Sequence, residues 1–335
     1  MLGRGRGSAR RCPSRANVTT LLLPGDVTGE EEERIAAAGA GRVRLVRQPH
    51  GAKAEIAVTG VYESPFADVI AEMTELRWIH SMSAGVDGIL APELARRELW
   101  LTSSAGAYAS GMTDYVVAAM VFLARGWAEW IEAQRGQRWL DQVPLGCGLR
   151  GSKLGIVGYG SVGRHLALAA KAIGMTVIAT RRTPMIATAE PVDALLRPES
   201  LGRLLEESDF VVISTALTAE TRGLIGDGEL RMMKGSAFLI NVSRGAVIDQ
   251  EALAAALNEG RIAGAMLDVV TPEPLPPTSP LWGVPNLWIT PHISGDTTGG
   301  RRAAIDLLCD NLSIYLDGQP HRMANLVDVR AQMQG

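Results

Sequence analysis

The sequence predicts an α/β protein with a doubly wound parallel sheet. Short apolar segments alternate with helical segments along most of the chain, and this alternation is typical of parallel strands joined by right-handed crossovers. The segments FVVIST (210–215) and AFLINVS (237–243) are apolar almost throughout, as strands covered on both faces must be. A glycine-rich segment, GYGSVG (158–163), stands where one strand passes into a helix.

Length and composition restrict the class of protein further. The chain has 335 residues, of which 47% are hydrophobic and 21% charged, and its net charge is −3. At roughly 150 residues per domain we expect two domains. The near-neutral charge does not favour a nucleic-acid or membrane-surface partner bound through bulk charge. The 3 cysteines, Cys12, Cys147 and Cys309, fit neither a disulfide framework nor a metal-ligand spacing, so we expect no metal site and a cytoplasmic location.

Residues 1–16, MLGRGRGSARRCPSRA, are rich in arginine and contain no acidic residue. Two interpretations stay open. Organellar transit peptides have this composition, and so do segments that are simply disordered. We expect a disordered leader.

The first part of the chain is expected to alternate strand and helix. Thr28 and Glu31 form a capping-box pattern, which predicts a helix that begins there and runs to Ala38. Tyr108–Arg125 and Trp127–Leu140 are predicted as long helices. Strands are expected at Val18–Leu23, Arg42–Val46, Glu55–Thr59, Leu76–His80 and Leu99–Ser103.

The second part of the chain alternates more regularly. A helix is predicted at Val162–Ile173, directly after the glycine-rich segment. Strands are expected at Lys153–Gly158, Thr176–Thr180, Phe210–Thr215, Ala237–Val242, Ala263–Val269 and Leu287–Thr290.

The glycine-rich segment predicts a dinucleotide site because it follows a strand and opens a helix. Gly158 permits the tight turn, Gly160 lets the backbone approach a pyrophosphate, and Gly163 lets the helix pack closely on the sheet. The phosphates then lie at the helix N-terminus, where unpaired N–H groups favour an anion. The alternative is a glycine-rich turn without a ligand. The residues between these glycines that we expect at the cofactor are Tyr159, Ser161 and Val162.

The end of the next strand indicates which dinucleotide binds. An NAD site places an acidic residue about 20 residues beyond the glycines, to accept hydrogen bonds from the ribose. Here the positions are Arg181, Arg182 and Thr183. Two guanidinium groups and a hydroxyl would bind a 2′-phosphate, which a carboxylate would repel. We therefore expect NADP, with NAD still possible.

Three polar residues stand at the carboxyl ends of later strands, where ligands bind in open α/β sheets. They are Arg244, Glu273 and His292. Arg244 would hold a substrate carboxylate and polarise a carbonyl, and His292 would carry the proton. A buried Glu273 would orient the imidazole and favour its charged form. Of the 5 histidines, His80 is the one rival, and we expect it to be structural.

Several long segments resemble the D-isomer-specific 2-hydroxyacid dehydrogenase family, including its glyoxylate- and hydroxypyruvate-reducing members. They are SMSAGVDGI (81–89), VGYGSVGR (157–164), LTAETRGLI (217–225), NVSRGAVID (241–249), GAMLDVVTPEPLP (264–276) and TPHISG (290–295). The resemblance implies an oxidoreductase that reduces a small 2-keto acid to a D-2-hydroxy acid. It also implies that Arg244, Glu273 and His292 are the catalytic residues.

The resemblance assigns further positions. The backbone around Ala84, Gly85 and Val86 matches the loop that holds the substrate carboxylate. Asp268 matches the aspartate that hydrogen-bonds the nicotinamide carboxamide, and Thr215 and Ser243 match residues of the cofactor cleft. The implied fold is a Rossmann domain inserted into a flavodoxin-like substrate domain. We expect the substrate domain at 17–103 and 292–335 and the dinucleotide-binding domain at 104–291.

Family members are usually homodimers, which the predicted long helices at 108–140 would suit. Trp139 could reach a partner subunit's active site, although packing is the role we expect for it. One alternative function stays open. Corepressors related to the family retain the same three residues and act as dinucleotide-responsive binding modules with little turnover. They favour NAD, however, which the two arginines at 181 and 182 do not.

Overall fold

The computed structural model describes residues 18–47, 53–60, 73–86, 88–89, 98–141, 146–182 and 190–329. The expected leader at 1–16 lies outside these residues. The chain divides into two compact units, one formed by Met1–Tyr108 with Arg301–Gly335 and the other by Ala109–Gly300. The second unit is thus inserted into the first. The domain boundaries expected from the family resemblance lie earlier in the chain, at 103/104 and 291/292.

The first unit is built on a parallel sheet with the strand order β2-β1-β3-β4-β5. This order is that of flavodoxin-like folds. Each strand lies inside a segment that the sequence predicts as a strand, except that β4 extends one residue beyond its segment. The strands are β1 (Thr19–Leu22), β2 (Val43–Val46), β3 (Ile56–Thr59), β4 (Trp78–Ser81) and β5 (Trp100–Ser103).

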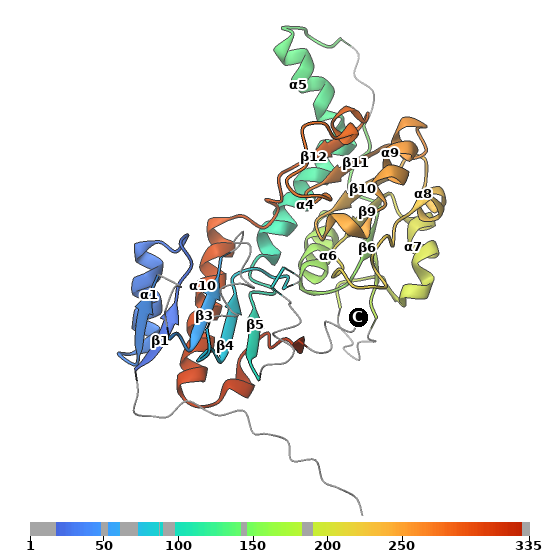
Figure 1. Ribbon diagram of the computed structural model, residues 1–335. Helices are drawn as coiled ribbons and strands as arrows, with labels where there is room; N and C mark the ends of the chain where they lie inside the picture. The colour runs from blue at the N-terminus through green and yellow to red at the C-terminus, as the bar shows by residue number, and fades with distance from the viewer. Residues whose placement is uncertain are drawn as a thin grey trace, which may run out of the picture. The chain divides into compact units, whose positions relative to one another are not determined.

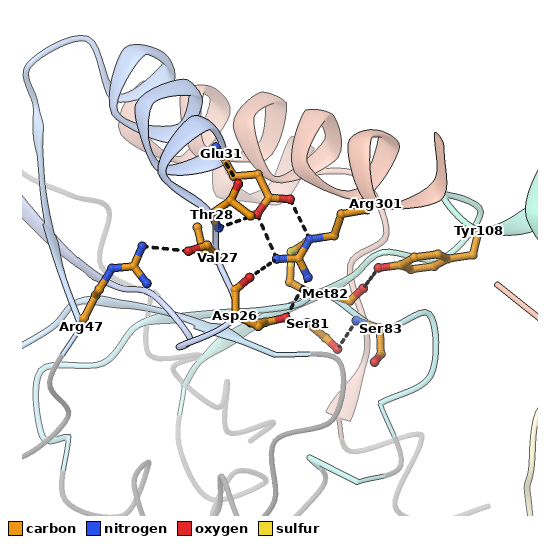
Figure 2. A network of polar contacts seen from close by, with 10 residues as sticks. All are labelled: Asp26, Val27, Thr28, Glu31, Arg47, Ser81, Met82, Ser83, Tyr108 and Arg301. Carbon is orange, nitrogen blue, oxygen red and sulfur yellow. Dashed lines mark hydrogen bonds and ion pairs between the residues drawn. The ribbon is translucent and has the colours of Figure 1, made fainter. Parts of the chain in front are cut away.

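Helix α1 (Gly29–Gly39) begins at the predicted capping box, which is confirmed. Thr28 accepts a hydrogen bond from the backbone nitrogen of Glu31, and the Glu31 side chain accepts one from that of Thr28. Arg301 of helix α10 (Thr298–Leu316) donates to Glu31 and to Asp26 (Figure 2). The Arg301 guanidinium holds the pKa of the Glu31 carboxyl below its usual range. These contacts join the beginning of α1 to α10.

The core of the first unit lies between its helices and its sheet. Tyr315 of α10 stacks on Trp78 of β4, with ring centroids 5.2 Å apart. Both side chains are almost completely buried. His80 lies on the same strand and is also wholly buried.

The second unit contains a seven-stranded parallel sheet with the order β12-β11-β10-β9-β6-β7-β8. Numbered from its own first strand, this order contains the 3-2-1-4-5-6 arrangement of Rossmann folds. The predicted fold class is therefore confirmed. The strands are β6 (Lys153–Val157), β7 (Thr176–Thr180), β8 (Ala194–Leu196), β9 (Phe210–Ile213), β10 (Phe238–Asn241), β11 (Gly264–Leu267) and β12 (Leu287–Ile289).

Helices cover both faces of this sheet (Figure 1). Successive strand residues alternate between two buried clusters, as side chains with a period of two residues must. Leu154 and Ile156 pack in the cluster of α4 and α6, whereas Val157 packs in the cluster of the other helices. The helices are α4 (Ala109–Arg125), α5 (Trp127–Arg135), α6 (Ser161–Ile173), α7 (Leu201–Glu207), α8 (Asp227–Met232) and α9 (Gln250–Asn258), and the 3₁₀ turns are η1 (Pro198–Ser200), η2 (Gly245–Val247), η3 (Pro280–Gly283) and η4 (Pro320–Arg322, in the first unit).

Three elements differ most from prediction, and helix α10 was not predicted at all. Helix α5 ends at Arg135, not at Leu140, because Gly136 terminates it and Gln137 adopts a φ of 51°. Strand β8 was not predicted, because a segment of three half-buried residues is too short to show the apolar pattern of a strand. None of the helices within the described ranges is both long and apolar enough to cross a membrane.

Candidate active site

Three neighbouring strands of the second unit end at the same level. Asn241 of β10 pairs with Leu267 of β11, and Leu267 pairs with Ile289 of β12. Arg244 follows β10, Glu273 follows β11 and His292 follows β12. The sheet therefore brings the predicted trio to one edge, at the carboxyl ends of its strands.

Glu273 and His292 are in direct contact. Oε2 of Glu273 lies 2.8 Å from Nδ1 of His292, and Oε1 accepts a hydrogen bond of 3.0 Å from the backbone nitrogen of Val270. A carboxylate can only accept, so Nδ1 carries a proton. The side chains of His292 and Glu273 are 38% and 37% exposed. The expectation of a buried Glu273 is wrong, because the loop after β11 carries it to the surface.

A turn built by Asn241 positions Arg244. The Asn241 side chain is buried; its Nδ2 donates to the carbonyl of Arg244, and its Oδ1 accepts from the backbone nitrogen and hydroxyl of Ser243. A Cβ on Gly245 would lie 2.2 Å from the carbonyl carbon of Val270. Only glycine therefore lets the turn after β10 approach the loop that carries Glu273.

Asp268 anchors the loop that carries His292. This side chain is 1% exposed, and its oxygens accept from the Thr290 hydroxyl and from the backbone nitrogens of Ile293 and Ser294. The hydroxyl of Tyr115 lies 2.6 Å from that of Thr290. The role expected for Asp268 toward a nicotinamide stays a prediction.

The glycine-rich loop fits a dinucleotide. Gly158 adopts a φ of 97°, and a Cβ there would lie 2.5 Å from Cα of Thr215. A Cβ on Gly163 would lie 2.9 Å from the carbonyl oxygen of Gly158, so helix and loop are closely packed. A Cβ on Gly160 would meet nothing within 4 Å. Open space therefore stands at the first turn of α6, which begins at Ser161 and continues through Val162, where a pyrophosphate would bind.

Tyr159 joins this loop to the segment before β8. The Tyr159 side chain is buried, and its hydroxyl donates to Oε2 of Glu190 at 2.8 Å. Arg164 of α6 forms an ion pair with the same oxygen. Burial and the neighbouring carboxylate raise the pKa of Tyr159. The Tyr159 side chain therefore links the glycine loop to Glu190.

The residues expected to select the dinucleotide follow β7. Arg181 is half-buried and donates its backbone N–H to the carbonyl of Leu196, and Arg182 is exposed. Thr183 lies outside the described residues. Thr215 packs on the glycine loop, and Ser243 is 8% exposed in the turn before Arg244.

The expected substrate loop belongs to the first unit and is described by itself. Ala84 is exposed, Gly85 is half-buried and Val86 is buried. The backbone nitrogen of Ser83 bonds to the Ser81 hydroxyl, and the carbonyl of Met82 accepts from the Tyr108 hydroxyl at 2.6 Å (Figure 2). These contacts fix the start of the loop.

His80 has a structural place. Its Nδ1 lies 2.8 Å from the Thr102 hydroxyl and its Nε2 3.3 Å from the Ser104 hydroxyl, all of them buried. Burial lowers the pKa of His80 to about 3. Trp139, by contrast, is 90% exposed, so it is not packed within the part of the chain that the structure describes, contrary to expectation.

Asn241, Tyr115 and Thr290 were not among the predicted site residues. Each is an ordinary polar residue in a strand or helix, or at a strand end. Tyr115 lies in none of the family-like segments. Asn241 and Thr290 begin the segments NVSRGAVID and TPHISG and stand at the end of β10 and directly after β12, and these were the available signals.

Comparisons with known proteins identify the family of this chain. The family model described as D-isomer specific 2-hydroxyacid dehydrogenase, NAD binding domain, matches residues 117–294. A glyoxylate reductase from Thermococcus gammatolerans is 33% identical over 288 residues, which cover 83% of this chain and 85% of that protein. A glyoxylate reductase/hydroxypyruvate reductase from Mus musculus is 37% identical over 248 residues, 73% of this chain and 75% of that protein.

A solved structure is similar over nearly the whole chain. It is a D-isomer specific 2-hydroxyacid dehydrogenase from Xanthobacter autotrophicus Py2 in complex with NADPH and MES. The TM-score is 0.78 at 30% sequence identity, and the match covers 95% of this chain and 100% of that one.

Proposed function

The chain belongs to the D-isomer-specific 2-hydroxyacid dehydrogenase family, and from this premise we propose which of its residues perform the reaction and on what. It is an NAD(P)-dependent oxidoreductase that reduces a 2-keto acid to a 2-hydroxy acid. The proposed catalytic residues are Arg244, Glu273 and His292. The proposed substrates are of the glyoxylate or hydroxypyruvate type, the compounds named for the relatives from Thermococcus gammatolerans and Mus musculus.

The observation that carries this assignment is the 2.8 Å contact between Glu273 and His292. Because Nδ1 of the imidazole donates to the carboxylate, Nε2 is the ring nitrogen that can serve the substrate. In the imidazolium form of His292, Nε2 also carries a proton. His292 gives this Nε2 proton to the carbonyl oxygen as negative charge develops there. The carboxylate of Glu273 orients the ring and stabilises the imidazolium.

Arg244 supplies the fixed positive charge. Its guanidinium would bind the substrate carboxylate and stabilise the developing alkoxide. The Asn241 turn and the close approach of Gly245 to Val270 hold the backbone of Arg244 in place. In the first unit, the backbone amides around Ala84, Gly85 and Val86 are the proposed ligands of a substrate carboxylate.

The dinucleotide would lie along the glycine loop, with its pyrophosphate at Gly160 and Ser161. It supplies the hydride when bound. Arg181 and Arg182 support a preference for NADP, because they stand where an acidic residue would otherwise bind the ribose of NAD. The NADPH in the related structure from Xanthobacter autotrophicus Py2 is compatible with this preference. Thr215, Ser243 and Asp268 would line the rest of the cofactor site.

The alternative function, a dinucleotide-responsive binding module with little turnover, is not favoured. The relatives described above are named as reductases. The catalytic trio alone does not separate the two functions, whereas turnover does.

We also propose a cytoplasmic homodimer. The side chains of Trp127, Ile131 and Trp139 are 44%, 39% and 90% exposed on and just after α5. A second copy of the chain would cover these side chains, as apolar residues at the centre of an interface are covered. Sedimentation of the wild type and of Trp139→Ser with Ile131→Ser tests this proposal. A dimer that the double substitution converts to monomer supports it, and a wild-type monomer contradicts it.

The experiment that tests the function follows NADPH and NADH oxidation with glyoxylate, hydroxypyruvate, pyruvate and bulkier keto acids. We expect turnover that is fastest with the two small substrates and with NADPH. Tight dinucleotide binding without turnover of any keto acid would favour the binding module.

A further inference from the structure

His292 stands in a backbone conformation that needs support. Its φ is 56°, in the left-handed region, which side chains other than glycine, asparagine and aspartate seldom adopt. Its backbone nitrogen donates to the carbonyl oxygen of Asp268 at 2.8 Å and lies 3.0 Å from that of Thr290. The loop after β12 therefore turns sharply at this residue.

The carboxylate of Asp268 completes the support. Oδ1 accepts from the backbone nitrogen of Ile293 and Oδ2 from that of Ser294, both at 2.9 Å. The N–H groups of three consecutive residues thus converge on one residue, whose carboxylate is buried. This arrangement holds the turn because charged acceptors form strong bonds in a buried site.

A third donor to the carboxylate of Asp268 is the hydroxyl of Thr290, 2.6 Å from Oδ1. That bond uses the only hydroxyl proton of Thr290, so in the 2.6 Å contact between Tyr115 and Thr290 the tyrosine must donate. Burial raises the pKa of Tyr115 to about 12, so it keeps this proton at neutral pH. A chain of two directed hydrogen bonds runs from α4 to the anchor of the His292 loop.

We propose that Thr290, oriented by Tyr115, is a positioning residue for His292. It fixes the carboxylate of Asp268, which fixes the turn at 292–294, and the turn directs the imidazole toward Glu273. The inference rests on the proposed function of His292 as proton donor. Neither Thr290 nor Tyr115 needs to touch substrate or dinucleotide for this role.

The test uses substitutions that remove single hydroxyl groups from the full-length enzyme. Thr290→Val deletes the hydroxyl that donates to Asp268 with little change in shape, and Thr290→Ser keeps such a hydroxyl. Tyr115→Phe removes the hydrogen bond from Tyr115 to Thr290. Thr113→Val is the matched control, because Thr113 lies on the same helix as Tyr115 and its buried hydroxyl donates only to the carbonyl of Ala109 among the described contacts. Single-turnover NADPH oxidation is measured with the fastest keto acid of the panel, in H₂O and D₂O, together with KM and the Kd of NADPH.

For Thr290→Val we expect a rate loss of about tenfold to a hundredfold, since a small misplacement of a catalytic group has effects of this order. KM and Kd should change by less than about threefold, and the solvent isotope effect should rise because proton transfer becomes slower. Thr290→Ser should return the rate to within about threefold of wild type. A general loss of packing would not be rescued in this way, nor would it separate kcat from KM.

Two results would overturn the proposal. The first is a wild-type single-turnover rate for Thr290→Val when His292→Gln lowers that rate by more than a hundredfold. This result would leave the proposed function of His292 intact. The second applies if Thr290→Val fails to fold: a wild-type rate for Tyr115→Phe then decides against it, and a loss above about threefold with unchanged KM decides for it. If His292→Gln itself keeps the wild-type rate, the proposed function fails instead.

Discussion

The carboxylate of Glu273 bridges the imidazole of His292 and the backbone of its own loop. One oxygen lies 2.8 Å from Nδ1 of His292, and the other accepts from the backbone nitrogen of Val270 at 3.0 Å. The imidazole is therefore held by a group that is itself held. Such support of a catalytic group by a second, fixed group is what orientation in an active site requires.

Replacement of Glu273 by glutamine should slow the reaction. The amide has nearly the same shape but no charge, so it cannot stabilise the imidazolium, and it presents one donor where two acceptors are needed. We expect kcat to fall by about tenfold to a thousandfold, with little change in the Kd of NADPH. Steady-state kinetics and dinucleotide fluorescence measure both. An unchanged kcat would remove Glu273 from the mechanism.

Replacement of Arg181 by alanine should change the choice of cofactor. The guanidinium would pair with a 2′-phosphate that NADH lacks, so the Kd of NADPH should rise by about tenfold or more while that of NADH stays within about threefold. Titration of each dinucleotide measures the ratio. Arg203→Ala is the matched control, because Arg203 is an exposed arginine of α7 paired with Glu207. Equal effects on NADPH and NADH would refute the 2′-phosphate argument.

A methyl group on Gly245 should disrupt the position of Arg244. The added Cβ would lie 2.2 Å from the carbonyl carbon of Val270, and backbone cannot yield as a flexible side chain can. Gly245→Ala should lower the free energy of unfolding by about 1–3 kcal/mol and reduce kcat at the same time. Gly228→Ala on α8 is the control, since its Cβ would meet nothing within 4 Å. Thermal melts and turnover that match the control would show that the close approach does not matter.

The buried His80 should make stability depend on pH. Its pKa is lowered to about 3 in the folded protein, whereas in the unfolded chain it is near 6.5. Between these values the unfolded state binds more protons than the folded state. The free energy of unfolding therefore has its highest value above about pH 6.5 and decreases toward pH 3, by about 1 kcal/mol per pH unit. His80→Gln should lose stability at neutral pH and show a flatter decline on acidification. Denaturant melts at several pH values test this, and parallel curves for both proteins would contradict it.

The sequence predicts the two sheets and the placement of Arg244, Glu273 and His292 after neighbouring strands, for a physical reason. Strands buried on both faces are apolar runs, and polar residues shortly after each run stand at the edge of the sheet, so Arg244 and His292 could be placed from the chain alone. The contacts that hold these residues in place could not be predicted. Tyr115 and Thr290 are 175 residues apart, and the left-handed turn at His292 has no glycine to announce it.

Exposure was also beyond prediction. Glu273 was expected to be buried beside His292, yet the loop after β11 leaves its side chain 37% exposed. Trp139 was expected to pack, yet it follows the glycine that ends α5 and is 90% exposed. Both depend on where a loop turns, which local patterns do not specify.

The most direct test of the mechanism is the single-turnover rate of NADPH oxidation by His292→Gln with glyoxylate, measured beside the Kd of NADPH. If the imidazole supplies the proton, the rate falls by more than a hundredfold while the Kd stays within about threefold of wild type. A rate close to that of the wild type, or a loss of rate matched by the loss of dinucleotide affinity, would contradict the role of His292 as proton donor.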